Sequence, residues 1–127
     1  MSTTAARRGL RAQRAIPIVR RRCGPRTAFL VEDRDGVFRL HLLEGRNFFV
    51  GRAEACQLRI DEPEISRHHA IIRCHDDRYE VFDCASTNGL RVNGRIVRAQ
   101  VLADGDVMAF GRWECRFQLL RGPGDRP

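Results

Sequence analysis

Lysine is absent from this sequence of 127 residues, and all 23 basic side chains are therefore arginines. Chemistry that depends on a lysine, such as a Schiff base or the lysine of a phosphate-binding loop, is excluded. Long apolar runs are missing as well, because none approaches the roughly 18 to 20 residues that a membrane-spanning helix needs. The length fits one domain with a tail and excludes a multidomain enzyme.

Cysteine is sparse and unpaired. The five cysteines are odd in number and widely spaced, and no two of them form a CxxC pair. Neither a disulfide framework nor a zinc site is indicated by this spacing. We therefore expect reduced thiols, no bound metal, no cofactor and a cytoplasmic protein.

Acidic residues are absent from the first 26 positions, which carry eight arginines. The formal net charge of +7 comes from this arm, since the rest of the chain has fifteen arginines and sixteen acids. Such a composition predicts a disordered arm over 1–26, and any affinity for polyanions should lie there. An organellar transit peptide and a bacterial tail have the same composition, so both alternatives stay open. The glycine- and proline-rich end, 121–127, is expected to be a flexible tail.

Between these ends, short apolar runs alternate with turn residues, which predicts an all-β domain over 27–120. Asp35-Gly36 and Asn93-Gly94 are strong hairpin signals, because these residues tolerate the positive φ angles of tight turns. About ten short strands indicate a sandwich or a barrel. The predicted strands are 27–32, 37–43, 47–52, 57–60, 70–75, 78–83, 90–92, 95–97, 107–110 and 114–120.

Alternation along these strands also predicts the core. In the run 79–83, the period of two places Tyr79 and Val81 on one side of the strand. Ten large apolar side chains are enough for a domain of this size to fold without a metal or a disulfide. The expected core residues are Phe29, Phe48, Val50, Ile60, Ile72, Val81, Val92, Leu102, Val107 and Phe117.

Three loop segments combine turn residues with hydrogen-bond donors: Gly51-Arg52, the run 66–70 (SRHHA) and the run 86–89 (STNG). A phosphate ester carries about −1.5 to −2 charges and three strong acceptor oxygens, so its receptor needs a cation and hydroxyl donors. Such a set is present in Arg52, Ser66, Arg67 and Thr87. The amide of Asn88 can both donate and accept, which suits the main chain of an extended peptide.

The order of these motifs is recognisable. The motifs come in the order GR, SRxHA, a strand reading YxVxD, STNG, VNG and LxDGDVMxFG. This is the order found in the forkhead-associated (FHA) domain, which the sequence resembles over roughly residues 27 to 120. The resemblance implies a β-sandwich of eleven strands that binds phosphothreonine peptides through loops at one end and has no catalytic activity. The implied partner is a phosphothreonine-containing protein, such as a Ser/Thr kinase or its substrate.

The resemblance also assigns roles to single residues. It makes Arg52, Ser66, Arg67 and Thr87 phosphate contacts, and it makes Asn88 the residue that holds the peptide main chain. A further residue, Glu64, occupies a position that helps some relatives choose the third residue after the phosphothreonine, and its carboxylate should disfavour an acidic residue there. The positions expected to be structural are Gly51, His69, Gly89 and Asn93.

The sequence raises three alternatives to phosphopeptide binding. An enzyme is not expected, because no nucleophile with a partner base is visible and Asp104 and Asp106 fit a turn in which aspartate caps backbone donors. The rival function is a nucleic-acid or anionic-surface binder that acts through the arginine-rich arm. A third possibility is that Thr3 or Thr4 is phosphorylated and folds back onto the domain's own site, as in small bacterial relatives of the family.

Overall fold

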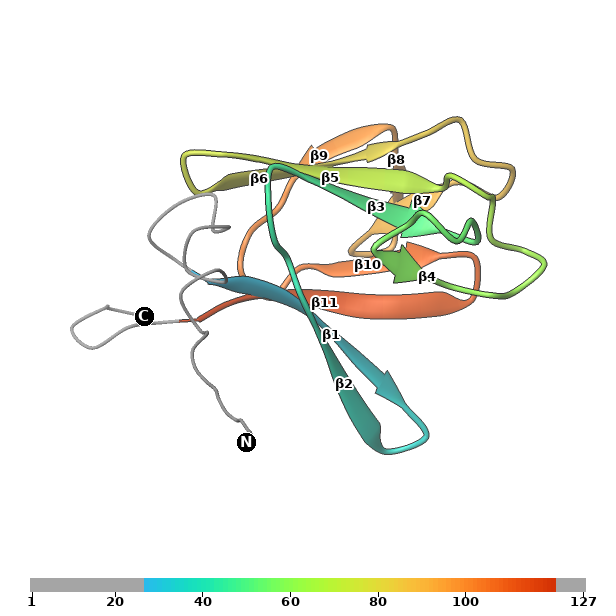
Figure 1. Cartoon of the computed structure of the whole chain (residues 1–127), viewed down its shortest axis with the longest axis horizontal. Helices are drawn as coiled ribbons and strands as arrows, with labels where there is room; N and C mark the ends of the chain where they lie inside the picture. The colour runs from blue at the N-terminus through green and yellow to red at the C-terminus, as the bar shows by residue number, and fades with distance from the viewer. Residues whose placement is uncertain (1–26, 121–127) are drawn as a thin grey trace, which may run out of the picture.

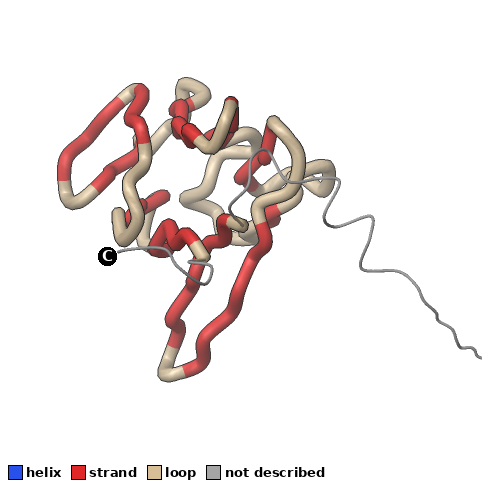
Figure 2. The backbone as a smooth tube through the Cα atoms, turned by 90° about the vertical axis from the view of Figure 1, so that its left-hand side faces the viewer, coloured by secondary structure: helices blue, strands red, loops and turns tan. Residues whose placement is uncertain are grey.

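A computed structural model describes residues 27–120, which form eleven β-strands and no helix (Figure 2). The described range therefore holds no helix long and apolar enough to cross a membrane. The predicted disordered arm, 1–26, and the predicted flexible tail, 121–127, lie outside the described residues, as do Thr3 and Thr4. The strands are β1 (Ala28–Arg34), β2 (Val37–Leu42), β3 (Asn47–Gly51), β4 (Leu58–Arg59), β5 (Ala70–His75), β6 (Arg78–Asp83), β7 (Leu90–Val92), β8 (Arg95–Val97), β9 (Ala99–Val101), β10 (Val107–Phe110) and β11 (Trp113–Leu119).

The strands form two sheets that pack face to face as a sandwich (Figure 1). One sheet has six strands in the order β2-β1-β11-β10-β7-β8, and the other has five in the order β4-β3-β5-β6-β9. All neighbouring strands are antiparallel except β3 and β4. The predicted all-β sandwich is confirmed.

Ten strands were expected from the apolar runs, and the structure adds β9, whose three residues pair with β6. The total of eleven agrees with the number that the family resemblance implied. Both predicted hairpin turns have two residues with positive φ, at Asp35 (54°) and Gly36 (78°) and at Asn93 (52°) and Gly94 (83°). These angles are those of a primed turn, which matches the twist of the flanking strands.

Eight of the ten expected core residues are buried, and Tyr79 and Val81 share the buried face of β6. The other two predictions are wrong. Half-buried Phe29 lies on the outer face of β1, and Val107 is 36% exposed on β10. Both strands have apolar residues on each face, so alternation alone could not identify the inner one. The expectation of reduced thiols is wrong at Cys74, which is in a disulfide, whereas the other cysteines of the described range, Cys56, Cys84 and Cys115, are free.

Candidate functional site

The three loop segments singled out in the sequence lie at the same end of the sandwich (Figure 1). Arg52 follows the last residue of β3 directly, and Ser66 and Arg67 lie in the loop that leads into β5. Thr87 and Asn88 lie in the loop between β6 and β7. We call these five residues the phosphate cluster, after the contacts that the family resemblance predicts for the first four; Asn88 is predicted to hold the peptide main chain beside them.

Hydrogen bonds hold Arg52 against the β4–β5 loop. Its backbone N–H donates to the carbonyl oxygen of Ser66 at 3.1 Å, and its side-chain Nε donates to the carbonyl oxygen of Ile65 at 3.0 Å. The next backbone N–H, of Ala53, donates to the carbonyl oxygen of Arg67 at 3.0 Å. These bonds fix the guanidinium plane beside Ser66.

The charge of Arg52 is not neutralised by the rest of the domain. No carboxylate among residues 27–120 forms an ion pair with its guanidinium, whereas Arg34 and Arg59 pair with Glu62 and Asp61. The side chain is half-buried, and its terminal amino groups have no protein partner within the described range. An anchored cation with unused donors is suited to an anion.

Ser66 connects two loops through its hydroxyl. Its Oγ accepts a hydrogen bond from the backbone N–H of Thr87 at 3.0 Å, which leaves the hydroxyl proton of Ser66 free to donate. Arg67 is exposed, and neither its guanidinium nor its backbone N–H has a partner among the described residues. The loop of Ser66 and Arg67 therefore offers hydroxyl, backbone amide and guanidinium donors, and hydrogen bonds join it to Arg52 and to Thr87.

His69 supports the loops of the phosphate cluster from the interior of the domain. It is fully buried, and its ring packs edge-on against Phe110 with centroids 5.5 Å apart. Its Nδ1 accepts a hydrogen bond from the backbone N–H of Ser66 at 3.1 Å, and its Nε2 donates to the carbonyl oxygen of Gly89 at 2.8 Å. One imidazole thus joins the loop that carries Ser66 to the loop that carries Asn88.

The amide of Asn88 is oriented by Glu64. Its Nδ2 donates to the backbone carbonyl of Glu64 at 2.8 Å, so that Oδ1 and the second amide proton remain available. The carboxylate of Glu64 accepts a hydrogen bond from the backbone N–H of Arg112 at 3.2 Å. A surface cleft beside Asn88 is lined by Glu64, Arg91, Gly111 and Arg112.

A family model described as "FHA domain" matches residues 48–111, about half of the chain. The chain belongs to the FHA domain family. This FHA domain is similar to the oxoglutarate dehydrogenase inhibitor of Corynebacterium glutamicum, at 33% identity over 84 residues, which is 66% of this chain and 57% of that protein. It is 34% identical over 82 residues to the glycogen accumulation regulator GarA of Mycolicibacterium smegmatis, which is 65% of this chain and 51% of that protein. The chain thus spans about half the length of these curated relatives.

Two solved structures show the same fold. One, described as a structural and functional analysis of phosphothreonine-dependent FHA domain interactions, is 31% identical with a TM-score of 0.69 and covers 75% of this chain and 98% of that chain. The other is EmbR of Mycobacterium tuberculosis in complex with a low-affinity phosphopeptide, 27% identical with a TM-score of 0.72. It covers 87% of this chain and 30% of that chain.

Three residues of this FHA domain were not assigned a role from the sequence. The carboxylate of Asp83 accepts hydrogen bonds from the backbone N–H of Ser86 at 3.2 Å and from its hydroxyl at 2.5 Å. Ser86 Oγ in turn accepts the backbone N–H of Gly89 at 2.9 Å. Between them, Ala85 has a φ of +55°, a left-handed conformation that costs about 1 kcal/mol for a non-glycine residue. The Asp-x-x-Ser spacing was the available signal for this turn.

Asn93 supports the fold at a distance from the phosphate cluster. Its Nδ2 donates to Asp106 at 3.0 Å, and its Oδ1 accepts the backbone N–H of Val107 at 3.0 Å. Asp106 and Asp104 also accept backbone N–H groups, of Ala103 and Leu119 respectively, both at 2.8 Å. The two aspartates therefore cap backbone donors, as expected of a turn.

The thiols nearest to the phosphate cluster are not activated nucleophiles. Burial raises the pKa of Cys56, whose Sγ donates to the carbonyl oxygen of Arg67 at 3.5 Å. Burial, helped by the charge of Asp83, also raises the pKa of Cys84. A reactive cysteine needs the opposite shift. Within residues 27–120, no group of three metal-ligating side chains comes together.

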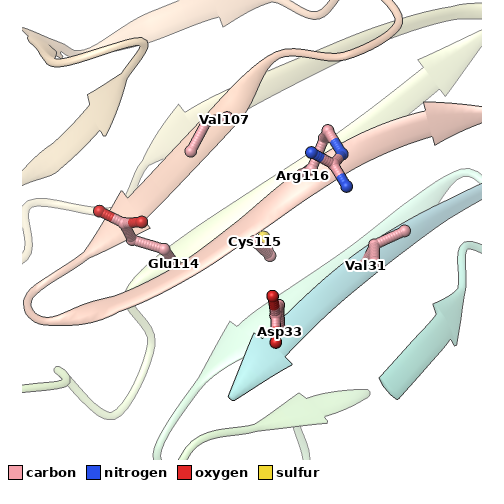
Figure 3. A pocket seen from close by; sticks show the side chains of 6 residues that line it. All are labelled: Val31, Asp33, Val107, Glu114, Cys115 and Arg116. Atoms are coloured by element: carbon pink, nitrogen blue, oxygen red, sulfur yellow. The ribbon is translucent and has the colours of Figure 1, made fainter. Parts of the chain in front are cut away.

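A second surface pocket lies on the outer face of the six-stranded sheet (Figure 3). Val31 and Asp33 of β1 line it together with residues of β10 and β11. It contains no residue of the phosphate cluster, and its charged side chains, Asp33, Glu114 and Arg116, carry both signs. The phosphate cluster therefore remains the candidate site.

Gly51 allows the backbone of β3 to approach the β4–β5 loop, and this leads to a prediction. A Cβ at position 51 would lie 2.2 Å from the carbonyl oxygen of Arg67, closer than any real contact. We expect Gly51→Ala to lower the free energy of unfolding by about 1 to 3 kcal/mol and to weaken phosphopeptide binding, because the loop must move. Urea denaturation and calorimetry measure the two effects.

The control for this substitution is Gly45→Ala. Gly45 has a φ of +77° and open space around its Cβ position, so that alanine there costs only backbone strain, about 1 kcal/mol. It should leave binding unchanged, since Gly45 precedes β3 and Arg52 follows it, so that the two lie at opposite ends of this strand. If Gly51→Ala were tolerated as well as Gly45→Ala, the close approach would not matter.

Proposed function

We propose that this FHA domain is a non-catalytic adaptor module that binds phosphothreonine peptides in Ser/Thr-kinase signalling. The observation that carries the proposal is the anchored guanidinium of Arg52, which has no carboxylate partner within the described range and lies beside a serine whose hydroxyl proton is free. A guanidinium that is held in place and has unused donors is positioned to take an anionic ligand. A doubly charged ester provides that ligand.

The phosphate oxygens would divide among four side chains. The planar guanidinium of Arg52 can donate to two of them at once, which a lysine could not do. Ser66 and Thr87 donate through their hydroxyls, and Arg67 donates through its side chain or its free backbone N–H. This division accounts for why the cluster draws on three separate loops.

Asn88 would recognise the peptide main chain beside the phosphothreonine. An extended peptide presents one N–H and one C=O per residue, and Asn88 has an acceptor and an amide proton to spare after its bond to Glu64. The bond to Glu64 fixes which way the amide points. Recognition of the main chain adds affinity without depending on the partner's side chains.

The proposed partner is defined by its chemistry, as a protein that contains phosphothreonine. The relatives are named as an inhibitor of oxoglutarate dehydrogenase and as a regulator of glycogen accumulation, and neither name describes a catalyst. EmbR was solved with a phosphopeptide. We extend this class of ligand to the present chain and propose a phosphothreonine-containing kinase or kinase substrate as the partner. A cytoplasmic location stays a prediction.

The test is calorimetry with a degenerate phosphothreonine peptide set, run beside the same peptides with unphosphorylated threonine and with phosphoserine. We expect micromolar binding, which corresponds to about 8 kcal/mol, for the phosphothreonine set alone. A missing methyl group should weaken the phosphoserine peptides about 10-fold to 200-fold. Equal binding of the unphosphorylated set would overturn the proposal.

Glu64 is proposed as a residue that sets sequence preference. Its carboxylate lies in the cleft beside Asn88, which also holds the guanidiniums of Arg91 and Arg112. Replacing it by the isosteric amide, Glu64→Gln, leaves the cleft with positive charge only. We therefore expect a phosphopeptide library to shift toward acidic residues at the third position after the phosphothreonine, by a few-fold. An unchanged library profile would remove Glu64 from the specificity residues.

A further inference from the structure

The β1–β2 hairpin projects beyond the rest of the sandwich in both views (Figures 1 and 2). Its second strand, β2, is an edge strand of the six-stranded sheet. Proteins commonly protect sheet edges by keeping edge strands very short. Three edges of this sandwich follow that rule, because β4 has two residues and β8 and β9 have three each. β2 has six.

The outer face of this long edge carries exposed apolar side chains. Phe38 is 64% exposed and Leu40 is 66% exposed, and both lie on the outer face of the sheet with half-buried Leu42. Across β1 they face Asp33, Val31 and Phe29. Figure 3 shows the side chain of Val31 on this same face. An apolar strip therefore runs along the outer face of the hairpin.

Among residues 27–120, the backbone groups of the same residues have no partner on their outer side. The N–H of Leu43 donates to the carbonyl oxygen of Ala28 at 2.9 Å, which makes 28 and 43 a hydrogen-bonded pair. In an antiparallel ladder such pairs recur at every second residue, so Val37, Arg39 and His41 point their backbone groups toward β1. The N–H and C=O groups of Phe38, Leu40 and Leu42 therefore point away from the sheet.

We propose that this edge binds a second copy of the chain, with β2 pairing antiparallel to the β2 of its partner around a two-fold axis at Leu40. This register places Leu40 opposite Leu40, and Phe38 opposite Leu42, on the outer face. Three hydrogen-bonded residue pairs form along the edge, and all the outer side chains brought together are apolar. Two six-stranded sheets join into one.

Charge favours this register over its neighbours. A two-fold axis at Arg39 would set two guanidiniums directly opposite each other, which is unfavourable. With the axis at Leu40, Arg39 of one copy instead faces His41 of the other. That His41 lies 3.2 Å from Glu32, and this carboxylate compensates the guanidinium. The hairpin 28–43 carries three carboxylates and two guanidiniums, so the edge itself has little net charge to oppose association despite the +7 of the whole chain.

The experiment is sedimentation of the full chain over a concentration series, with Leu40→Arg as the disrupting variant. The wild type should sediment as a dimer at the upper concentrations. Leu40→Arg should be monomeric throughout, because the register puts the two new guanidiniums face to face. A matched control is Ile96→Arg, since Ile96 is also an apolar residue, 70% exposed, on the opposite edge strand β8. It should dimerise like the wild type.

A second variant guards against misfolding. Leu40→Pro removes an N–H that points away from β1, so it costs the hairpin none of its own hydrogen bonds but removes two from the symmetric pair. It too should be monomeric, with an unchanged circular dichroism spectrum. A wild type that stays monomeric up to about 1 mM overturns the proposal, whether the edge is free or is covered by the arm 1–26. So does a dimer that survives Leu40→Arg. No phosphopeptide is used, so the outcome is independent of the proposed function.

Discussion

Replacing Arg52 by alanine is expected to abolish measurable binding of phosphothreonine peptides. Its guanidinium is the one cation of the cluster that is both half-buried and fixed by hydrogen bonds to the β4–β5 loop. A hydrogen bond to a charged group contributes about 1.5 to 3 kcal/mol, and Arg52 can make two to the phosphate. Their loss, about 3 to 6 kcal/mol, should weaken binding by roughly 100-fold to 20,000-fold, which moves a micromolar complex to the millimolar range or beyond measurement.

Two further variants separate charge from geometry. Arg52→Lys keeps the positive charge but loses both the planar fork and the Nε bond to Ile65, so we expect binding between that of the wild type and of Arg52→Ala. Arg95→Ala removes an exposed arginine on β8 and should bind like the wild type. Calorimetry gives the affinities, and thermal unfolding confirms that each variant is folded. Wild-type affinity in a folded Arg52→Ala variant would refute the assignment of the site.

The strands and the positions of the loop motifs were accessible from the sequence, because each depends on residues close together in the chain. Alternation and the two Asx-Gly turns identified ten strands, and GR, SRxHA and STNG marked three strand ends. The sequence did not always predict which face of a strand is buried. In β1, Phe29 and Leu30 are both large and apolar, and only packing against the second sheet buries Leu30 and leaves Phe29 outside.

The internal geometry of the site needed coordinates. Nothing in the sequence indicates that Ala85 adopts a left-handed φ, because this angle follows from how the β6–β7 loop closes. Only the bond between Asp83 and Ser86 has a local signal, the Asp-x-x-Ser spacing. The carboxylate of Glu64 could not be placed without knowing that the β10–β11 turn lies beside it. Contacts between distant segments depend on the sandwich as a whole.

For the edge strand β2, too, the sequence predicts the strand but not its place in the sheet. The sequence predicts a strand over 37–43 and a tight turn before it, but not that this strand is the last in its sheet. Strand order is a property of the whole chain, and the exposed face of β2 becomes meaningful only when β1 is seen to pair with β11 on its other side.

Replacing His69 by alanine should have the largest effect on stability. The imidazole is fully buried, fills space against Phe110 and satisfies two backbone groups, the N–H of Ser66 and the carbonyl of Gly89. Alanine would leave both groups buried without a partner, at about 1 to 3 kcal/mol each, and would open a cavity beside the ring of Phe110. We expect the free energy of unfolding in urea to fall by about 3 to 5 kcal/mol.

The neighbouring histidine provides the control. His68 is exposed and has no partner among the described residues, so His68→Ala should change stability by no more than about 0.5 kcal/mol. His69→Gln retains one donor and one acceptor and should recover part of the loss. Because His69 joins the loop of Ser66 to the loop of Asn88, both folded variants at position 69 should also bind phosphopeptide more weakly than His68→Ala. Equal stability of the two alanine variants would mean that the buried imidazole does not hold the loops together.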